Sequence, residues 1–176
     1  MTGRQRTKVL LVLGGASSGK SAFALRLAER AAPRAFVATC EPLDQEMASR
    51  IAAHRRERGK EWETVEQPLQ IVAWFHDHGG RYKSVVVDCL TLWLSNLLHQ
   101  GESDQAILQQ VDQLLVALHN VPGRVVLVSN EVGFGIVPEH PLSRRFRALA
   151  GTVNQRVAQA AHAVYLVVSG LSLQLK

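Results

Sequence analysis

A glycine-rich segment near the start of the sequence has the composition and spacing of a phosphate-binding loop. Residues Gly14–Ser21 read Gly-Gly-Ala-Ser-Ser-Gly-Lys-Ser and match the pattern G-x-x-x-x-G-K-[ST] in full. The glycines let successive backbone N–H groups turn toward one concavity, and the dipole of the following helix adds positive potential there. We expect Lys20 to reach the β- and γ-phosphates of a nucleotide and Ser21 to offer its hydroxyl to Mg²⁺. A glycine-rich turn that binds nothing is the alternative, and spacing and context both argue against it.

A carboxylate on the metal side of such a loop is expected where a neighbouring parallel strand ends. Asp88 directly follows the apolar run Val85–Val87, and Glu131 follows the next apolar run along the chain. An acid in this position holds Mg²⁺ beside the phosphates of many nucleotide-binding enzymes. Asp88 is therefore the first candidate and Glu131 its competitor. Asp88 is also a candidate N-cap of the helix expected after it, and the two roles are compatible.

His54 is the centre of a second group of residues with chemical potential. In a segment expected to be helical, His54 follows Met47 by nearly two turns and shares a face with Met47 and Ile51. A lone histidine at that spacing is more often a packing residue than a catalyst. Four basic residues follow it closely: Arg55, Arg56, Arg58 and Lys60. Such a cluster can hold polyphosphate oxygens through charge-assisted bonds, although a solvated basic surface is the simpler interpretation of these charges alone.

Short apolar runs alternate with longer segments of helical periodicity, which predicts βα units and a parallel sheet. The expected strands are 9–13, 35–39, 84–88, 124–129 and 163–168, with 62–67 ambiguous and a short tail after a turn at 169–170. The expected helices are 21–32, 44–58, 70–76, 90–99, 104–118 and 144–161. The predicted fold class is therefore α/β and P-loop NTPase-like, with a mostly parallel sheet of about five or more strands flanked by helices.

Length and composition are typical of one globular domain. The chain has 176 residues, of which 47% are hydrophobic and 20% charged, so disorder is excluded as the main state. Cys40 and Cys89 are too few for a disulfide scaffold or a four-thiolate zinc site, which favours a cytoplasmic location. The longest apolar run, 9–13, is too short for a membrane span. We expect a basic N-terminal extension at 1–8 and a single P-loop nucleotide-binding catalytic domain at 9–176.

The net charge of +5 predicts anionic partners, which include nucleotides and nucleic acids. Nucleic-acid binding is the less favoured of the two, because the charge is concentrated near His54 and forms no extended stripe interleaved with aromatic residues. Six further histidines lack metal-ligand spacing and are interpreted as surface or loop residues: His76, His78, His99, His119, His140 and His162. The three tryptophans are expected in the core and not on a bound ring: Trp62, Trp74 and Trp93.

Several short segments, taken together with the phosphate loop, resemble one enzyme family. They are Ala38–Cys40, Arg50–His54, Trp62 with Glu66, Val87–Thr91 with Asn96–Leu98, and Val128–Pro138. From about residue 10 to its end the chain is similar to the bifunctional adenosylcobinamide kinase / adenosylcobinamide-phosphate guanylyltransferase family of cobalamin biosynthesis. The phosphate loop is shared with many NTPases and discriminates little. The block Asn130–Pro138 together with the His54 helix is far more specific.

The resemblance implies two successive reactions. The terminal phosphoryl group of ATP or GTP moves to the aminopropanol hydroxyl of adenosylcobinamide. GTP then guanylylates a histidine with release of pyrophosphate, and the GMP passes to the new phosphate to give adenosylcobinamide-GDP. Because one step attacks the γ-phosphorus and the other the α-phosphorus, we expect a shifted nucleotide or a movement of the 47–58 helix between them. A P-loop small-molecule kinase without guanylyltransferase activity is the alternative function, and a basic nucleic-acid-binding module is a third.

The resemblance also implies roles for individual residues, matched motif by motif. The guanylylated histidine is His54, and Lys20 is the second catalytic residue. The implied nucleotide contacts are Gly14, Gly15, Ala16, Ser17, Ser18, Gly19, Lys20, Ser21, Ala38, Thr39, Cys40, Arg55, Arg56, Glu57, Arg58, Glu66 and Asp88. The implied metal is Mg²⁺ at Ser21 and Asp88, with GTP and ATP as substrates. The family commonly has arginine where this chain has Ser17. The resemblance also implies a homotrimer.

Overall fold

A seven-stranded sheet forms the centre of the computed structural model, which describes residues 7–29, 31–40, 59 and 61–176. Its strands are β1 (Lys8–Gly14), β2 (Arg34–Ala38), β3 (Trp62–Glu66), β4 (Ser84–Asp88), β5 (Arg124–Asn130), β6 (Ala163–Val168) and β7 (Leu171–Gln174). They lie side by side in the order β3-β2-β4-β5-β1-β6-β7, and only the β6–β7 pair is antiparallel. The predicted fold class is confirmed.

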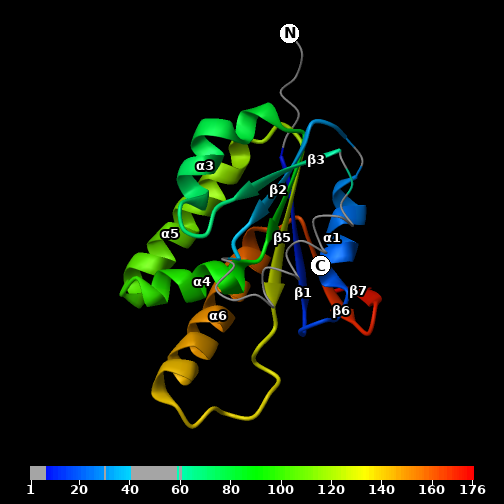
Figure 1. The fold of residues 1–176 in the computed structure, drawn as a ribbon. Helices are drawn as coiled ribbons and strands as arrows, with labels where there is room; N and C mark the ends of the chain where they lie inside the picture. Colours follow the sequence, from blue (N-terminus) through cyan, green and yellow to red (C-terminus); the bar gives the residue numbers. More distant parts are fainter. Residues whose placement is uncertain (1–6, 30, 41–58, 60) are drawn as a thin grey trace.

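Helices cover both faces of this sheet (Figure 1). They are α1 (Lys20–Ala28), α3 (Ile71–His78), α4 (Leu90–His99), α5 (Asp104–Ala117) and α6 (Pro141–Ala160). Helix α1 packs on one face, and helices α3 to α6 pack on the other. The central strands are therefore buried on both sides, which explains why β1, β4 and β5 are almost continuously apolar in sequence.

Both edges of the sheet hold strands that the sequence did not assign firmly. The ambiguous segment 62–67 contains β3, paired in parallel with β2. The short tail expected after the turn at 169–170 contains a further strand, because Leu171–Gln174 pairs antiparallel with β6. The segment alternates apolar and polar residues, as a strand does, but it is only four residues long and all four are exposed at the sheet edge.

Two helix boundaries differ from the expected ones by three residues or more, and both lie near a proline. Helix α1 ends at Ala28 and not at Ala32, and Ala32 precedes Pro33, a position that disfavours helical backbone. Helix α6 starts at Pro141, three residues earlier than expected, because proline suits the first turn of a helix. The expected helix at 44–58 lies outside the described residues. Among the described residues, no helix is long and apolar enough to cross a membrane.

The three tryptophans are buried and pack in the core, as expected. Trp93 is completely buried, and its Nε1 donates to the carbonyl oxygen of Leu69 at 2.9 Å. The six histidines outside the His54 segment are exposed, which confirms their interpretation as surface or loop residues. The parallel strands all end at one edge of the sheet, and the candidate site lies there.

Candidate functional site

The phosphate loop lies where the sequence predicts it, between the end of β1 and the start of α1. Two of its glycines are required by the geometry. A Cβ on Gly14 would lie 2.5 Å from the carbonyl oxygen of Val167, and Gly19 has a φ of +91°, in the left-handed region. Ser17 is also left-handed, with a φ of 54°. These conformations turn the chain sharply, so that the loop closes within a few residues and α1 begins at Lys20.

The turn between β6 and β7 supports the phosphate loop from behind. The backbone N–H of Gly170 donates to the carbonyl oxygen of Ser18 at 2.9 Å, and a Cβ on Gly19 would touch Gly170. Gly14 also lies opposite Val167 in the β1–β6 register. Sequence reasoning missed this support, because it placed residues 169–170 in a simple turn before a tail. The phosphate loop is therefore supported by β1, by the neighbouring strand β6 and by the β6–β7 turn.

Lys20 is almost fully buried within the loop that it belongs to. Its Nζ donates to the carbonyl oxygen of Gly15 at 2.8 Å. Burial lowers the pKa of Lys20 below its ordinary value, and the negative charge of Asp88 opposes that shift. A buried ammonium group gains from a nearby anion. The side chain is thus placed to bind a phosphate group at this edge of the sheet.

Asp88 is the last residue of β4 and is partly buried. It lies opposite Ala38 in the β2–β4 register, and its charge acts on Lys20. The alternative role as helix cap is not borne out, since Cys89 occupies the N-cap position of α4. Asp88 is therefore positioned as an acid beside the phosphate loop, as the sequence predicts.

Glu131, the competing acid, fixes its own loop. Its Oε1 accepts a hydrogen bond from the backbone N–H of Gly133 at 3.0 Å, and its own N–H donates to the carbonyl oxygen of Gly14 at 3.1 Å. Glu131 thus ties the segment after β5 to the start of the phosphate loop.

The donor chemistry at this edge fits Mg²⁺. The hydroxyl of Ser21 and the carboxylate of Asp88 are oxygen donors, which this cation prefers, and one or two protein oxygens suffice when substrate phosphates supply others. Among the described residues there is no cluster of three or more His, Cys, Asp or Glu side chains that would indicate a metal site made by protein alone.

A buried polar network holds the backbone next to Asp88, and sequence reasoning missed it. The hydroxyl of Thr39 accepts from the N–H of Cys89 at 2.8 Å and donates to the carbonyl oxygen of the same residue at 2.7 Å. Asn96 Nδ2 donates to the carbonyl oxygens of Thr39 and Pro68 at 2.8 and 3.0 Å. The side chains of Thr39 and Asn96 thus satisfy buried backbone groups of Cys89 and Thr39. These hydrogen bonds fix the end of β2 next to the residue that follows Asp88.

The same network continues toward β5. The thiol of Cys89 lies 3.1 Å from Thr91 Oγ1, which accepts from Asn130 Nδ2 at 2.8 Å. Burial, together with the charge of Asp88, raises the pKa of the Cys89 thiol to about 11, so the thiol stays neutral. Thr91, Asn96 and Asn130 all fall within the segments that carry the family resemblance. Their pairing was not visible in the sequence, because it joins elements far apart along the chain.

The remaining site residues divide into two groups. Thr39 is fully buried, while Cys40 is partly buried and Glu66 is exposed at the end of β3, opposite Ala38 in register. These residues lie at the same edge of the sheet as Asp88. His54, Arg55, Arg56, Glu57 and Arg58 lie outside the described residues, as does Lys60.

Comparisons with known proteins show the family of this chain. A family model described as cobinamide kinase / cobinamide phosphate guanyltransferase matches residues 10–175. A bifunctional adenosylcobalamin biosynthesis protein of Escherichia coli strain K12 is 41% identical over 180 residues, covering 96% of this chain and 99% of its own length. A protein of the same description from Pseudomonas aeruginosa is 43% identical over 167 residues, covering 94% and 96% of the two chains.

Solved structures show the fold at greater distance. A KaiC-like protein from Pyrococcus horikoshii OT3 superposes with a TM-score of 0.53 at 16% identity, over 90% of this chain and 70% of that one. The P4 protein of bacteriophage phi6, solved in complex with ADP, gives a TM-score of 0.50 at 15% identity, over 94% and 52%. At these identities the likeness concerns the fold alone.

Proposed function

We propose how the residues of this chain, which belongs to the cobinamide kinase / cobinamide phosphate guanyltransferase family, divide the work of two reactions. The protein is an enzyme of adenosylcobalamin biosynthesis with kinase and guanylyltransferase activities. It phosphorylates cobinamide with a nucleoside triphosphate and then transfers GMP from GTP to the phosphorylated product. The alternative of a kinase without guanylyltransferase activity does not fit this membership.

The kinase half is assigned to the edge where β1 and β4 end. The backbone N–H groups of Gly14–Ser21 cradle the phosphates, and the ammonium group of Lys20 neutralises charge on the γ-phosphoryl group as it moves. Asp88 and the hydroxyl of Ser21 would hold Mg²⁺, which when bound neutralises charge on the phosphate oxygens. The substrate hydroxyl attacks the γ-phosphorus, its oxygen bonds to phosphorus, and the bond to the β-phosphate oxygen breaks to leave a nucleoside diphosphate. The hydroxyl proton is released in the same step.

The guanylyltransferase half is assigned to His54, with the family motif as its support. A neutral imidazole nitrogen attacks the α-phosphorus of GTP, a nitrogen–phosphorus bond forms, and pyrophosphate leaves. The phosphate oxygen of cobinamide phosphate then attacks the same phosphorus and releases the histidine. The basic cluster after His54 is proposed to stabilise the leaving pyrophosphate, and neighbouring positive charge favours the unprotonated imidazole.

The remaining nucleotide contacts are proposed on both sides of the site. They comprise Ala38, Thr39, Cys40, Arg55, Arg56, Glu57, Arg58 and Glu66, in addition to Gly14–Ser21 and Asp88. Thr39 is fully buried, its side chain binds the backbone of Cys89 and its N–H donates to the carbonyl oxygen of Asp88, so its proposed contribution is to fix Ala38 and Cys40 beside the nucleotide. The attacked phosphorus differs between the two reactions, so either the nucleotide or the 47–58 segment changes position between them. A cytoplasmic homotrimer that binds small molecules and no nucleic acid completes the proposal.

One observation supports the kinase assignment most strongly: Lys20 is buried in the phosphate loop, and the charge of Asp88 acts upon it. The test uses adenosylcobinamide and Mg²⁺ with GTP labelled at the α-phosphate in one reaction and at the γ-phosphate in another. Chromatography of the products is expected to show γ-label in cobinamide phosphate first and α-label in cobinamide-GDP later. Appearance of α-label in the corrinoid without earlier γ-transfer would contradict the proposed order.

A further inference from the structure

The loop between β5 and α6, residues 131–140, exposes large apolar side chains. Phe134 is 82% exposed, Ile136 95% and Val137 65%. The loop leaves the end of β5, extends beyond the sheet and returns to the start of α6 (Figure 1). Exposure of several large apolar side chains on one loop is typical of a surface that binds a ligand or a partner.

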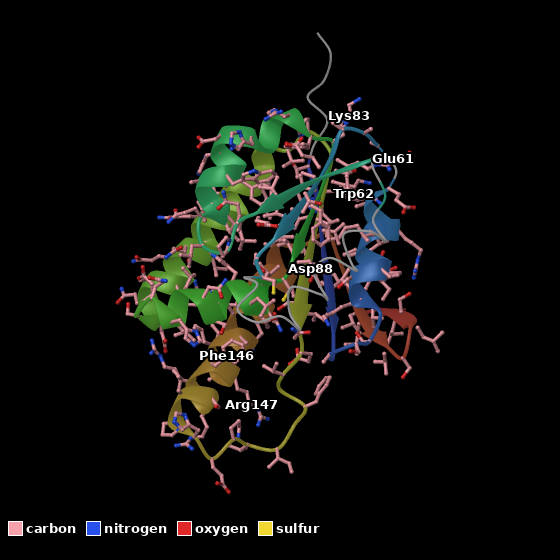
Figure 2. All side chains as sticks on the ribbon, viewed as in Figure 1. Glu61, Trp62, Lys83, Asp88, Phe146 and Arg147 are labelled. Atoms are coloured by element: carbon pink, nitrogen blue, oxygen red, sulfur yellow. The ribbon has the colours of Figure 1, made fainter. Side chains whose placement is uncertain are left out.

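Arginines of α6 hold this loop in a defined shape. Arg147 Nη2 donates to the carbonyl oxygen of Gly133 at 2.5 Å, and Figure 2 shows Arg147 beside the loop. Arg144 Nη1 donates to the carbonyl oxygens of Pro138, at 3.1 Å, and of Glu139. With Glu131 holding the N–H of Gly133, backbone groups at both ends of the loop are fixed. The apolar side chains are thus presented on a braced segment.

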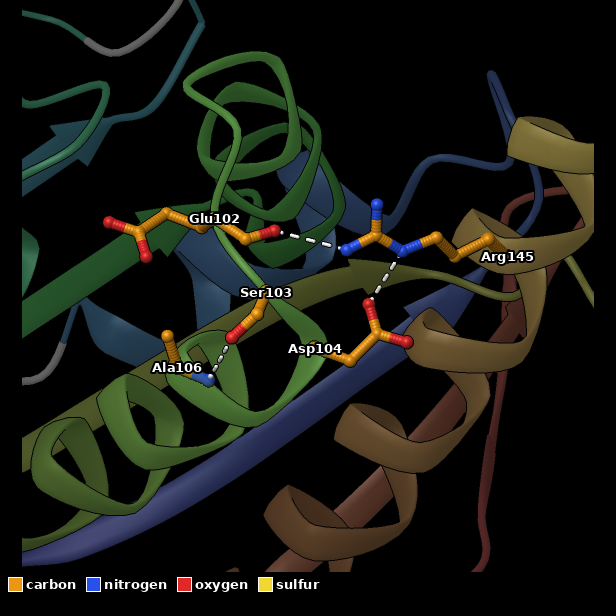
Figure 3. A network of polar contacts seen from close by, with 5 residues as sticks. All are labelled: Glu102, Ser103, Asp104, Ala106 and Arg145. Atoms are coloured by element: carbon orange, nitrogen blue, oxygen red, sulfur yellow. Dashed lines mark hydrogen bonds and ion pairs between the residues drawn. The ribbon is translucent and has the colours of Figure 1, made fainter.

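The start of α6 is itself anchored on its other side. Arg145 Nε pairs with Asp104 Oδ1 at 2.7 Å, and its Nη2 donates to the carbonyl oxygen of Glu102 at 3.0 Å (Figure 3). Ser103 in the same turn caps α5 by accepting from the N–H of Ala106 at 3.2 Å. Arg144 and Arg147 therefore contact the loop, whereas Arg145 contacts the α4–α5 turn. The helix is tied to the α4–α5 turn on one side and carries the loop on the other.

A cavity of about 280 Å³ lies between this loop and α6. Its lining includes Val137, Arg147, Gly151, Thr152 and Gln155, and no carboxylate is among its lining residues. Arg147 Nη1 is buried and has no hydrogen-bond partner within the described part of the chain. An unsatisfied buried guanidinium N–H is costly, and a ligand oxygen would remove that cost. The cavity is at the small end of ligand sites, which suits one edge of a large ligand.

We propose that the loop 131–140 and the facing side of α6 hold the corrinoid ring of the substrate. This inference rests on the proposed function. The loop begins at the phosphate site, since Asn130 pairs with Gly14 and the N–H of Glu131 donates to the carbonyl oxygen of Gly14. The hydroxyl to be phosphorylated sits on a short side arm of the macrocycle, so the ring must lie next to that site.

The chemistry of the macrocycle matches the surface. Its periphery carries methyl groups and carboxamide arms, which are apolar and uncharged polar groups. Phe134 and Ile136 contact the apolar edge, and a carboxamide oxygen enters the cavity to accept from Arg147 Nη1. The lining contains Arg144 and Arg147 and no acidic residue, so it offers hydrogen-bond donors that suit the oxygen of a carboxamide arm. The loop therefore contributes to binding of both cobinamide and cobinamide phosphate.

The test measures steady-state phosphoryl transfer at saturating GTP while the cobinamide concentration is varied. The variants are Phe134→Ser, Ile136→Ser and Arg147→Gln. Matched controls are Val116→Ser, which changes an exposed apolar residue of α5, and Arg156→Gln, which breaks an exposed ion pair with Asp112. Loss of a buried apolar side chain from the complex is expected to raise the KM for cobinamide about 10- to 100-fold. The kcat, the KM for GTP and formation of the GMP adduct without cobinamide should stay within about twofold, as should every value for the controls.

Three outcomes would overturn the proposal. A KM for cobinamide unchanged in all three variants would show that the ring binds elsewhere. A changed oligomeric state in light scattering after size-exclusion chromatography would assign the apolar loop to contacts between copies of this chain. A wild-type enzyme that forms no cobinamide phosphate would contradict the proposed function itself, which separates that failure from a failure of the subsite alone.

Discussion

Two loops leave neighbouring parallel strands at the same edge of the sheet, and they differ in almost every physical property. The phosphate loop after β1 is short, folds tightly around Lys20 and rests on the β6–β7 turn. The loop after β5 is longer, extends away from the sheet and exposes Phe134 and Ile136. The first loop offers mainly backbone N–H groups to a ligand, whereas the second offers mainly side chains.

This difference corresponds to two kinds of recognition. Triphosphates are common to many enzymes, and a loop of backbone donors with one lysine can bind them whatever else the ligand carries. Few enzymes bind a macrocycle, so recognition of its shape and polar groups requires specific side chains. We therefore expect changes in the first loop to alter chemistry and changes in the second to alter substrate affinity.

The largest effect is expected from Lys20→Ala. Removal of the ammonium group leaves developing charge on the transferred phosphoryl group uncompensated, which should lower the kcat of the kinase by about 10²- to 10³-fold. The KM for cobinamide should change little, unlike that of the variants in the second loop. Initial rates under saturating substrates provide the measurement, with the exposed Lys83→Ala as the matched control. A large increase in the KM for cobinamide would contradict the separation of the two loops.

A smaller effect is expected when one glycine of each loop is changed to alanine. In Gly14→Ala the new Cβ meets the carbonyl oxygen of Val167 at 2.5 Å, whereas nothing lies within 4 Å of a Cβ on Gly135. The first variant should lose about 1–3 kcal/mol of unfolding free energy, and the second should lose almost none. Urea denaturation of both variants compares them directly. Equal stabilities would show that the phosphate loop tolerates displacement.

The smallest effect concerns the buried polar network next to Asp88, which contains Cys89. Burial raises the pKa of the Cys89 thiol to about 11, whereas in the unfolded chain it is near its ordinary value of 9.0. The unfolded chain therefore releases this proton first, so stability is retained below pH 9 and falls as the pH rises toward 11. By pH 10 the loss should be about 1 kcal/mol. Urea denaturation at pH 8 and pH 10 should show that Cys89→Ala loses less unfolding free energy over this interval than the wild type. Equal losses would contradict a raised pKa of the Cys89 thiol.

The sequence predicted the phosphate side of the site well, because its information is local. Spacing within Gly14–Ser21 specifies a loop between a strand and a helix, and Asp88 follows a run of buried valines. The edge strand β7 was missed although Leu171–Gln174 alternates apolar and polar residues, because a run of only four residues gives a weak signal. The network from Thr39 through Cys89 to Asn130 was also missed, because its partners are brought together only by the order of the strands.

The shape of the loop after β5 could not be predicted from the sequence for a different reason. Its sequence, Val128–Pro138, contributed strongly to the family resemblance, yet its shape depends on arginines that follow in α6. Arg144 and Arg147 bind carbonyl oxygens of the loop, and no local pattern distinguishes them from surface charges. Their roles became visible only with the loop and the helix placed side by side.

The central claim is that one chain performs phosphoryl transfer at the phosphate loop and GMP transfer through His54. The most direct measurement incubates the wild type and His54→Ala with Mg²⁺ and GTP labelled at the α-phosphate, followed by denaturing electrophoresis, and follows phosphoryl transfer to cobinamide in a parallel reaction with GTP labelled at the γ-phosphate. The wild type should retain label and His54→Ala should lose it, while His54→Ala still phosphorylates cobinamide. Label retained by His54→Ala would contradict the claim that this histidine carries the GMP.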